Sequence, residues 1–212
     1  MFTIDIVSDI VCPWCYIGTR RLAAALAKVR SHHPDFRHAT RWRPFFLNPD
    51  TPPEGEPYLP FLEHKFGSRA RVEEIFNHVR AAGAAYGLTY AFEKIRLRAN
   101  TLLAHRLIFH ASQSGHSDAV VEQLFQAQFQ RGEHVGDLDV LCAIADACDL
   151  PSDTRAYLTS DTDTETVRED ARQLRAQGIA MVPTFILPDG KRVVGAEDPA
   201  VLANAILDTL AR

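Results

Sequence analysis

The chain has 212 residues, enough for one well-packed domain with a sizeable insertion or for two closely packed subdomains. Its hydrophobic fraction of 46% and charged fraction of 24% are ordinary for a globular protein and argue against wholesale disorder. The formal net charge of -4 gives no electrostatic reason to expect a nucleic-acid-binding protein, because such proteins usually gather a basic excess on one face.

The N-terminal segment indicates the compartment in which the protein works. Two aspartates, Asp5 and Asp9, precede the first basic residue, Arg20, whereas a secretory signal opens with a basic segment and continues with a long apolar one. No stretch approaches the roughly 20 apolar residues that cross a bilayer. We therefore expect a cytoplasmic protein with no membrane partner. In that compartment a close cysteine pair is more often catalytic or metal-binding than a structural disulfide.

Residues 3–47 predict a strand, a helix and a second strand. Thr3 to Val7 is rich in Ile and Val, which suits a short strand. A helix begins at Pro13, because the missing N–H of proline costs nothing in a first helical turn, and apolar residues follow at helical spacing. Phe36 to Leu47 returns to the alternation typical of a strand.

A proline-rich loop over 48–57 leads into a region that is almost wholly helical in pattern, from Tyr58 to about Gln177. Helix starts are indicated at Asn100-Thr101 and at Asp137, because the side chains of these residue types accept hydrogen bonds from the first backbone N–H groups of a helix.

The pattern changes again after residue 178. Residues 181–187 and 192–194 predict two strands of a hairpin around the turn signal Pro188-Asp189-Gly190. Asp198-Pro199 then begins a last helix. The order is therefore βαβ, a helical block, then ββα.

This order predicts an α/β protein with a thioredoxin-like fold and a large all-helical insertion. Residues 1–50 and 178–212 would form the thioredoxin-like domain, and residues 51–160 the helical insertion domain. A helix at about 161–177 would connect the two.

Cys12-Pro13-Trp14-Cys15 is the strongest chemical signal in the chain. The spacing places both sulfurs at the N-terminus of the predicted helix, where the helix dipole and unpaired N–H groups favour a thiolate. Cys12, the outermost, is expected to attack a disulfide, and Cys15, one turn further in, to resolve the mixed disulfide. A CxxC pair in a strand–helix–strand pattern is typical of redox chemistry.

Two other interpretations of this pair remain open. A structural zinc site would need four ligands, commonly from a second cysteine pair. The remaining cysteines, Cys142 and Cys148, are six apart in a helical stretch and would lie on different helix faces, so we expect no metal. Cys12 and Cys15 could instead be unconnected core residues. For Cys142 and Cys148 themselves, burial as small apolar side chains is the favoured interpretation.

Val182-Pro183-Thr184 is the second signal. A proline at the beginning of a strand can simply mark where that strand starts. If its peptide bond is cis, the turn would bring the Val182 backbone beside the dithiol, and an extended substrate could pair with it there.

Four segments of the chain resemble the DsbA-like thioredoxin family, specifically its cytosolic FrnE-like branch, and the resemblance extends over nearly the whole chain. They are Cys-Pro-Trp-Cys-Tyr-Ile-Gly at 12–18, Trp-Arg-Pro-Phe-Phe-Leu-Asn-Pro at 42–49, Asn100-Thr101 with Ala104-His105-Arg106-Leu107, and Val-Pro-Thr-Phe at 182–185. The resemblance implies a helical insertion in a thioredoxin fold, a nucleophile at Cys12, a resolving thiol at Cys15 and a cis bond before Pro183.

The expected function is that of a protein disulfide oxidoreductase, whose partners are protein or small-molecule thiols and disulfides. It needs no cofactor, with glutathione as a candidate redox partner. The alternative is a glutathione-dependent isomerase or transferase. Kappa-class glutathione transferases and 2-hydroxychromene-2-carboxylate isomerases belong to the same superfamily, but they typically carry serine where Cys12 stands. Such an enzyme would bind glutathione near Val182 and tolerate loss of Cys15. A third hypothesis is a redox-insensitive binding protein with packed cysteines.

The remaining assignments concern the surroundings of the dithiol. The candidate substrate-binding residues are Pro13, Trp14, Val182 and Asn100. Trp14 is expected to lie exposed beside the thiols. For Asn100, a helix-capping role is the favoured alternative to substrate contact. Asp9 either caps the first helix, which we favour, or relays protons to Cys15. Three phenylalanines are interpreted as insertion core that in part lines an apolar groove: Phe61, Phe66 and Phe76. A homodimer formed through the insertion is a further hypothesis.

Overall fold

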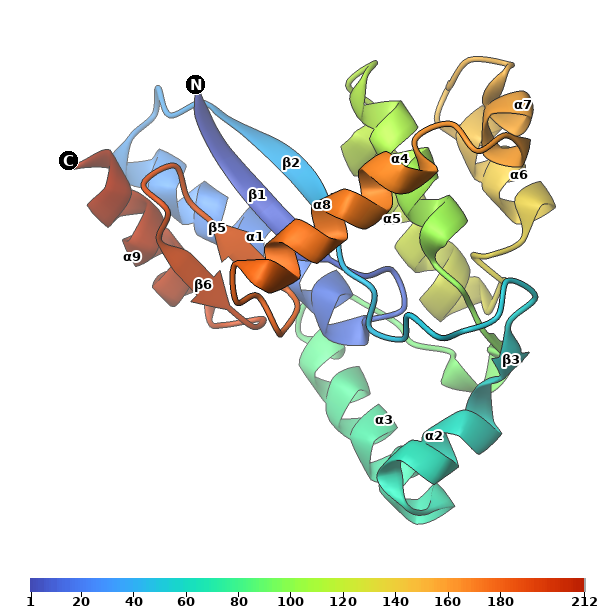
Figure 1. The fold of residues 1–212 in the computed structure, drawn as a ribbon. Helices are drawn as coiled ribbons and strands as arrows, with labels where there is room; N and C mark the ends of the chain where they lie inside the picture. Colours follow the sequence, from blue (N-terminus) through green and yellow to red (C-terminus); the bar gives the residue numbers. More distant parts are fainter. Residues whose placement is uncertain (212) are drawn as a thin grey trace.

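The thioredoxin-like part of the molecule is built from the two ends of the chain (Figure 1). The structure is a computed structural model that describes residues 1–211, so Arg212, the last residue of the predicted C-terminal segment, lies outside the described residues. A four-stranded sheet has the order β2-β1-β5-β6. Its strands are β1 (Phe2–Ser8), β2 (His38–Pro44), β5 (Thr184–Ile186) and β6 (Arg192–Val194).

The sheet is mixed, and its pairing confirms the predicted βαβ and ββα units. β1 runs parallel to β2 and antiparallel to β5, and β6 closes the C-terminal hairpin antiparallel to β5. In this register Ile6 lies between Trp42 and Phe185. The central strand β1 therefore joins the two halves of the fold.

Helices cover both faces of the sheet. α1 (Pro13–His32) and α9 (Pro199–Leu210) pack against one face, and α8 (Thr164–Ala176) crosses the other (Figure 1). β1 alternates accordingly, with Ile4 and Ile6 in the core beneath α1 and α9 and Val7 in the core beneath α8. This alternation is the period-two pattern expected of a strand with two covered faces.

α1 contributes to two separate cores. It starts where predicted, with Cys12 in an extended conformation and Pro13 in the first helical turn. Its C-terminal half, including Leu22 and Val29, packs against the sheet, whereas Tyr16 and the two cysteines belong to the core of the insertion. The turn that carries the dithiol thus lies between the two parts of the protein.

The insertion is mostly helical, as predicted. Its elements are α2 (Tyr58–Phe66), α3 (Arg69–Ala84), the 3-10 turn η1 (Phe92–Lys94), α4 (Leu102–Ser112), α5 (Ser117–Gln126), the π-helical turn η2 (Ala127–Arg131), α6 (Leu138–Ala147) and α7 (Thr154–Thr159). The predicted start at Asp137 is confirmed, because its carboxylate accepts hydrogen bonds from Asp139 N and Val140 N.

One small sheet was not predicted within this region. β3 (Glu56–Pro57) pairs antiparallel with β4 (Leu97–Arg98). Two-residue strands are too short to show any periodicity in a sequence, since the alternation of a strand needs at least about four residues to be recognised. The pair ties the end of the proline-rich loop to the segment that precedes α4.

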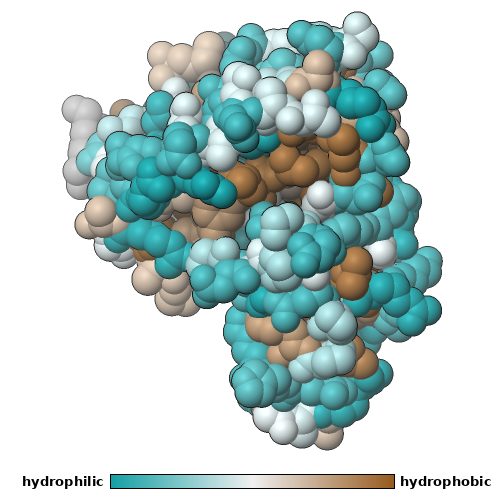
Figure 2. Space-filling model, turned by 45° about the vertical axis from the view of Figure 1, so that its right-hand side comes forward, coloured by the Kyte–Doolittle hydropathy of each residue, from teal (hydrophilic) through white to brown (hydrophobic). Residues whose placement is uncertain are grey.

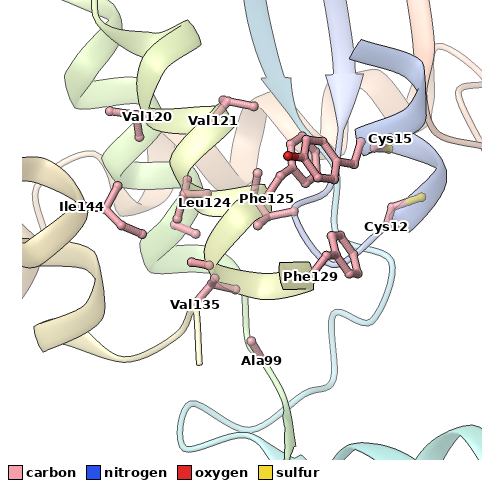
Figure 3. Packing of buried hydrophobic residues seen from close by; sticks show 14 of the residues in the cluster. Cys12, Cys15, Ala99, Val120, Val121, Leu124, Phe125, Phe129, Val135 and Ile144 are labelled. Carbon is pink, nitrogen blue, oxygen red and sulfur yellow. The ribbon is translucent and has the colours of Figure 1, made fainter. Parts of the chain in front are cut away.

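Tyr16 packs α1, the helix that carries Cys12 and Cys15, against the insertion. Its fully buried ring stacks on Phe125 of α5, with ring centroids 4.9 Å apart. Its hydroxyl donates to Glu122 Oε1 at 3.0 Å, and the same carboxylate forms an ion pair with Arg20 at 2.6 Å. Phe125 and Phe129 point from the α5–η2 segment toward the helix that carries Cys12 and Cys15 (Figure 3). The orientation of α1 therefore depends on this contact.

The surface is largely hydrophilic on the face shown in Figure 2, where hydrophobic side chains gather in a hollow across the middle. No helix within residues 1–211 combines the length and the apolar character needed to span a membrane.

Phe125→Ala should destabilise the protein by about 3–5 kcal/mol, because it removes a fully buried ring and its stack on Tyr16. Denaturant unfolding followed by circular dichroism measures the change. Val201→Ala is the control, since Val201 is 46% exposed on α9 and should change the free energy of unfolding by only about 0.5 kcal/mol. An equal effect of the two substitutions would contradict the proposed importance of the Tyr16 contact.

Candidate functional site

Cys12 and Cys15 lie together at the N-terminus of α1 (Figure 3). Cys12 occupies the position immediately before the helix, and its N–H donates to Asp9 O at 3.0 Å. Both thiols are free, with Cys12 6% and Cys15 2% exposed. The outer position predicted for Cys12 is confirmed, although the residue is more buried than its place at a helix end suggested.

The environment of Cys15 keeps its thiol protonated. Burial raises the pKa of Cys15 well above its ordinary value, and the neighbouring Cys12 sulfur raises it further. The Ser8 hydroxyl and the Asp9 backbone N–H act in the opposite direction, because both favour the charged sulfur. Cys15 is therefore a poor nucleophile until a partner accepts its proton.

The loop before β5 reaches the dithiol. The Val182–Pro183 peptide bond is cis, as the family resemblance implied. The Cys12 Sγ lies 3.9 Å from Val182 O, although the two residues are 170 positions apart in the sequence. Neither the N–H nor the C=O of Val182 forms a backbone hydrogen bond within residues 1–211, so both can pair with an extended ligand beside Cys12.

Gly18 allows this close approach, and the sequence analysis assigned it no role. A Cβ atom at Gly18 would lie 2.8 Å from Pro183 Cγ and 3.4 Å from Phe185 Cζ. Any side chain here would push the Pro183 loop away from α1. The glycine was visible in the motif at 12–18, but its purpose depends on a contact with the far end of the chain.

The predicted capping role of Asp9 is wrong. No side chain caps α1, and the Asp9 carboxylate turns away to accept a hydrogen bond from Leu47 N at 2.8 Å. Its second oxygen lies 3.4 Å from Nε2 of His105, and both residues are buried. Proline at the first helical position already removes one unpaired N–H, which lessens the need for a cap. Asp9 instead joins the end of β1 to the insertion.

An apolar cavity of about 320 Å³ adjoins Pro13 and Trp14. Phe61, Phe66 and Phe76 all line it, together with Val11, Leu47, Asn48, Tyr58, Leu62, Lys65, Val72, Ile75, Val79, Phe92, Arg98 and Gln128. Trp14 is half-buried, in ring contact with His78 at 5.4 Å, and is thus less exposed than expected. The predicted apolar groove beside the dithiol therefore exists, with Lys65 and Arg98 as its cations.

Asn100 lies outside this cavity. Its side-chain oxygen accepts from Leu102 N at 3.0 Å and its nitrogen donates to Thr51 O at 2.7 Å. Both polar ends are used within the protein, which fits the helix-start interpretation. Contact between Asn100 and a substrate stays a prediction without structural support.

The other two cysteines belong to the α6 region: Cys142 lies in the middle of that helix and Cys148 directly follows its last residue. Cys148 is buried, as favoured from the sequence, and Cys142 is half-buried. Among residues 1–211, no three His, Cys, Asp or Glu side chains gather in an arrangement that could hold a metal ion.

Comparison with known proteins places this geometry in context. Residues 3–207 match the DSBA-like thioredoxin domain family. A probable DsbA oxidoreductase from Streptomyces coelicolor has a TM-score of 0.90 and 28% identity, with 100% of this chain and 91% of that chain covered. YwbO of Bacillus subtilis (strain 168), an uncharacterized protein, is 26% identical over 97% of this chain and 96% of its own length. The cytosolic disulfide reductase DsbM of Pseudomonas aeruginosa shares the fold, with a TM-score of 0.67, 19% identity, and 97% of this chain and 94% of that chain covered.

Gly18→Ala should lower the rate of disulfide exchange at least about tenfold, because displacement of the active groups by even 1 Å is costly. The added methyl group would meet Pro183 and separate the Val182 backbone from Cys12. Exchange with a peptide disulfide measures the effect. Ala24→Ser is the control, because Ala24 is an exposed residue of the same helix and the substitution adds no atom against Pro183. A wild-type rate in Gly18→Ala would contradict the steric role.

Iodoacetamide should modify Cys12 well before Cys15 in the reduced protein at neutral pH. Because the pKa of Cys15 is raised above the ordinary thiol pKa of 9.0, this thiol stays neutral even at a pH above 9.0. Its labelling should therefore accelerate only at still higher pH. Peptide mass spectrometry after timed labelling measures both residues. Similar rates for the two cysteines at neutral pH would contradict their different environments.

Proposed function

Because the chain belongs to the DSBA-like thioredoxin domain family, we propose that it is a thiol–disulfide oxidoreductase that acts through the Cys12-Pro13-Trp14-Cys15 dithiol. One observation carries this proposal: two free thiols share a helix N-terminus, one of them beside Val182, whose N–H and C=O form no backbone hydrogen bond, and the other buried behind it. Packed structural cysteines would need no such segment beside them.

The first step is attack of the Cys12 thiolate on a substrate disulfide. The substrate S–S bond breaks, a Cys12–substrate disulfide forms, and the first substrate thiolate leaves and takes up a proton. The substrate backbone on either side of the sulfur pairs with the N–H and C=O of Val182, which hold it in line with Cys12.

The second step is attack of Cys15 on the Cys12 sulfur. Cys15 loses its proton, the Cys12–substrate bond breaks, and a Cys12–Cys15 disulfide forms as the second substrate thiol is released. Two substrate thiols are thereby produced and the dithiol is oxidised. The same steps in reverse transfer a disulfide to a partner.

The substrate disulfide carries an apolar group on one side. The cavity beside Pro13 and Trp14 offers mainly aromatic and aliphatic walls. Lys65 favours an acidic substituent there, whereas Arg98 is already paired with Glu56. Protein disulfides flanked by apolar residues meet this description, whereas glutathione disulfide meets only its acidic part, through its carboxylates. A structure of the fold-related reductase DsbM contains glutathione, and that protein is cytosolic, which supports a glutathione partner and a cytoplasmic location for this chain.

Cys12→Ser should abolish exchange, whereas Cys15→Ser should retain the first step and accumulate a mixed disulfide with the substrate. Turnover of a peptide disulfide and mass spectrometry of the trapped species measure the two effects. Cys142→Ala with Cys148→Ala is the matched control, which should exchange like the wild type. Full activity in Cys15→Ser would favour the glutathione-dependent isomerase instead, because that enzyme needs no resolving thiol.

Equilibration in graded reduced and oxidised glutathione should yield a reversible Cys12–Cys15 disulfide, detected by mass spectrometry after alkylation. A reduction potential near or below about −270 mV would indicate a reductase, and one above about −200 mV an oxidase or isomerase. Failure to form any intramolecular disulfide would refute the proposed dithiol couple.

A further inference from the structure

The backbone of Val182 aligns a substrate beside Cys12 only if the loop that carries Val182 is held in place. Val182 itself forms no backbone hydrogen bond within residues 1–211, and β5 begins two residues later at Thr184. Thr184 Oγ1 donates to Met181 O at 2.7 Å, which closes the loop on itself but does not attach it to another element. The attachment therefore depends on Pro183.

Two contacts anchor Pro183. Its ring packs on Gly18 of α1, where a Cβ atom would lie only 2.8 Å from Pro183 Cγ. Its carbonyl oxygen accepts a hydrogen bond from Gly195 N at 2.7 Å, one position beyond the last residue pair of the β5–β6 hairpin. The second contact holds Pro183 only if Gly195 and Ala196 are themselves fixed, because they follow β6 and belong to no helix or strand.

Arg21 fixes this segment from α1. Its guanidinium nitrogen Nη1 donates to Ala196 O, although the two residues are 175 positions apart in the sequence. Gly195 has a φ of 88°, in the left-handed region that favours glycine, so the chain turns sharply directly before Ala196. The hydrogen bond from Arg21 thus ties the chain to α1 immediately after this turn.

Arg21 and Gly18 act from the same face of α1. Residues three apart in a helix are neighbours on its surface. Here one of them contacts Ala196 and the other contacts Pro183. The helix that carries Cys12 therefore also holds the loop that carries Val182.

The guanidinium of Arg21 is held in turn by the insertion. Its Cζ lies 5.6 Å from the centre of the Tyr86 ring, which follows the end of α3. A contact of a guanidinium with an aromatic face is attractive and orients the arginine side chain. Arg21 thus joins three parts of the protein: the helix of the dithiol, the insertion and the C-terminal hairpin.

We infer that Arg21 is a positioning residue for extended substrates. By holding Ala196, it keeps Gly195 in place to bind Pro183, and it thereby sets the Val182 backbone where a peptide can pair with it beside Cys12. It acts through the loop and not by contact with the reacting sulfurs. The inference rests on the proposed disulfide exchange and adds a substrate class to it: disulfides with a peptide backbone around the sulfur are preferred to small disulfides without one.

Oxidation of the reduced protein by two disulfides tests this role. One is a peptide disulfide, and the other is bis(2-hydroxyethyl) disulfide, which is uncharged and has no peptide backbone. Alkylation at timed intervals followed by mass spectrometry gives the second-order rate constant for each. Arg21→Met should lower the peptide rate constant about tenfold, because it weakens two backbone hydrogen bonds that are each worth about fivefold, and should leave the other rate constant unchanged. Arg21→Lys, which keeps a donor for Ala196 O, should restore much of the peptide rate.

Arg30→Met is the matched control, because it removes an exposed arginine of the same helix, whose guanidinium contacts His38 Nδ1. It should leave both rate constants unchanged. A wild-type peptide rate in Arg21→Met, or equal slowing with both disulfides, would overturn the positioning role while leaving disulfide exchange intact. Failure of the wild type to form a Cys12–Cys15 disulfide with either oxidant would instead overturn the proposed exchange itself.

Discussion

The structure depends on one constraint: the first turns of α1 must pack against two cores at once. Tyr16 meets it, because its ring stacks on Phe125 of the insertion while the helix continues into the sheet core at Leu22. Burial and Glu122 raise the pKa of the Tyr16 hydroxyl, so it remains a donor to that carboxylate. The insertion is thereby held against the dithiol and supplies the walls of the apolar cavity.

A single helical turn creates two different sulfur environments. Cys12 precedes the helix and its Sγ contacts the backbone C=O of Val182, whereas Cys15 points into the protein beside the end of β1. The division of labour between attacking and resolving thiols follows from this geometry, since one sulfur meets the substrate and the other meets only protein.

Local patterns predicted the framework well. The strand at the N-terminus, the helix starting at Pro13 and the C-terminal hairpin are all encoded by short-range periodicity and turn residues. The contacts that complete the site are between segments far apart in the sequence. Asp9 looked like a helix cap because capping is a local rule, but its actual partner, Leu47, comes from a different segment of the chain. The role of Gly18 was likewise beyond sequence reasoning, because its neighbour Pro183 becomes visible only in the folded chain.

The separation of 170 residues between Cys12 and Val182 has a consequence for biosynthesis. Translation delivers the N-terminus first, so the CxxC segment leaves the ribosome long before β5 exists to pair with β1. At first the nascent polypeptide lacks the insertion core that buries its sulfurs, and until β5 is made it also lacks the Val182 loop. In the unfinished chain, Cys12 and Cys15 are thus open to uncontrolled oxidation, although the folded protein exposes them only to its substrates.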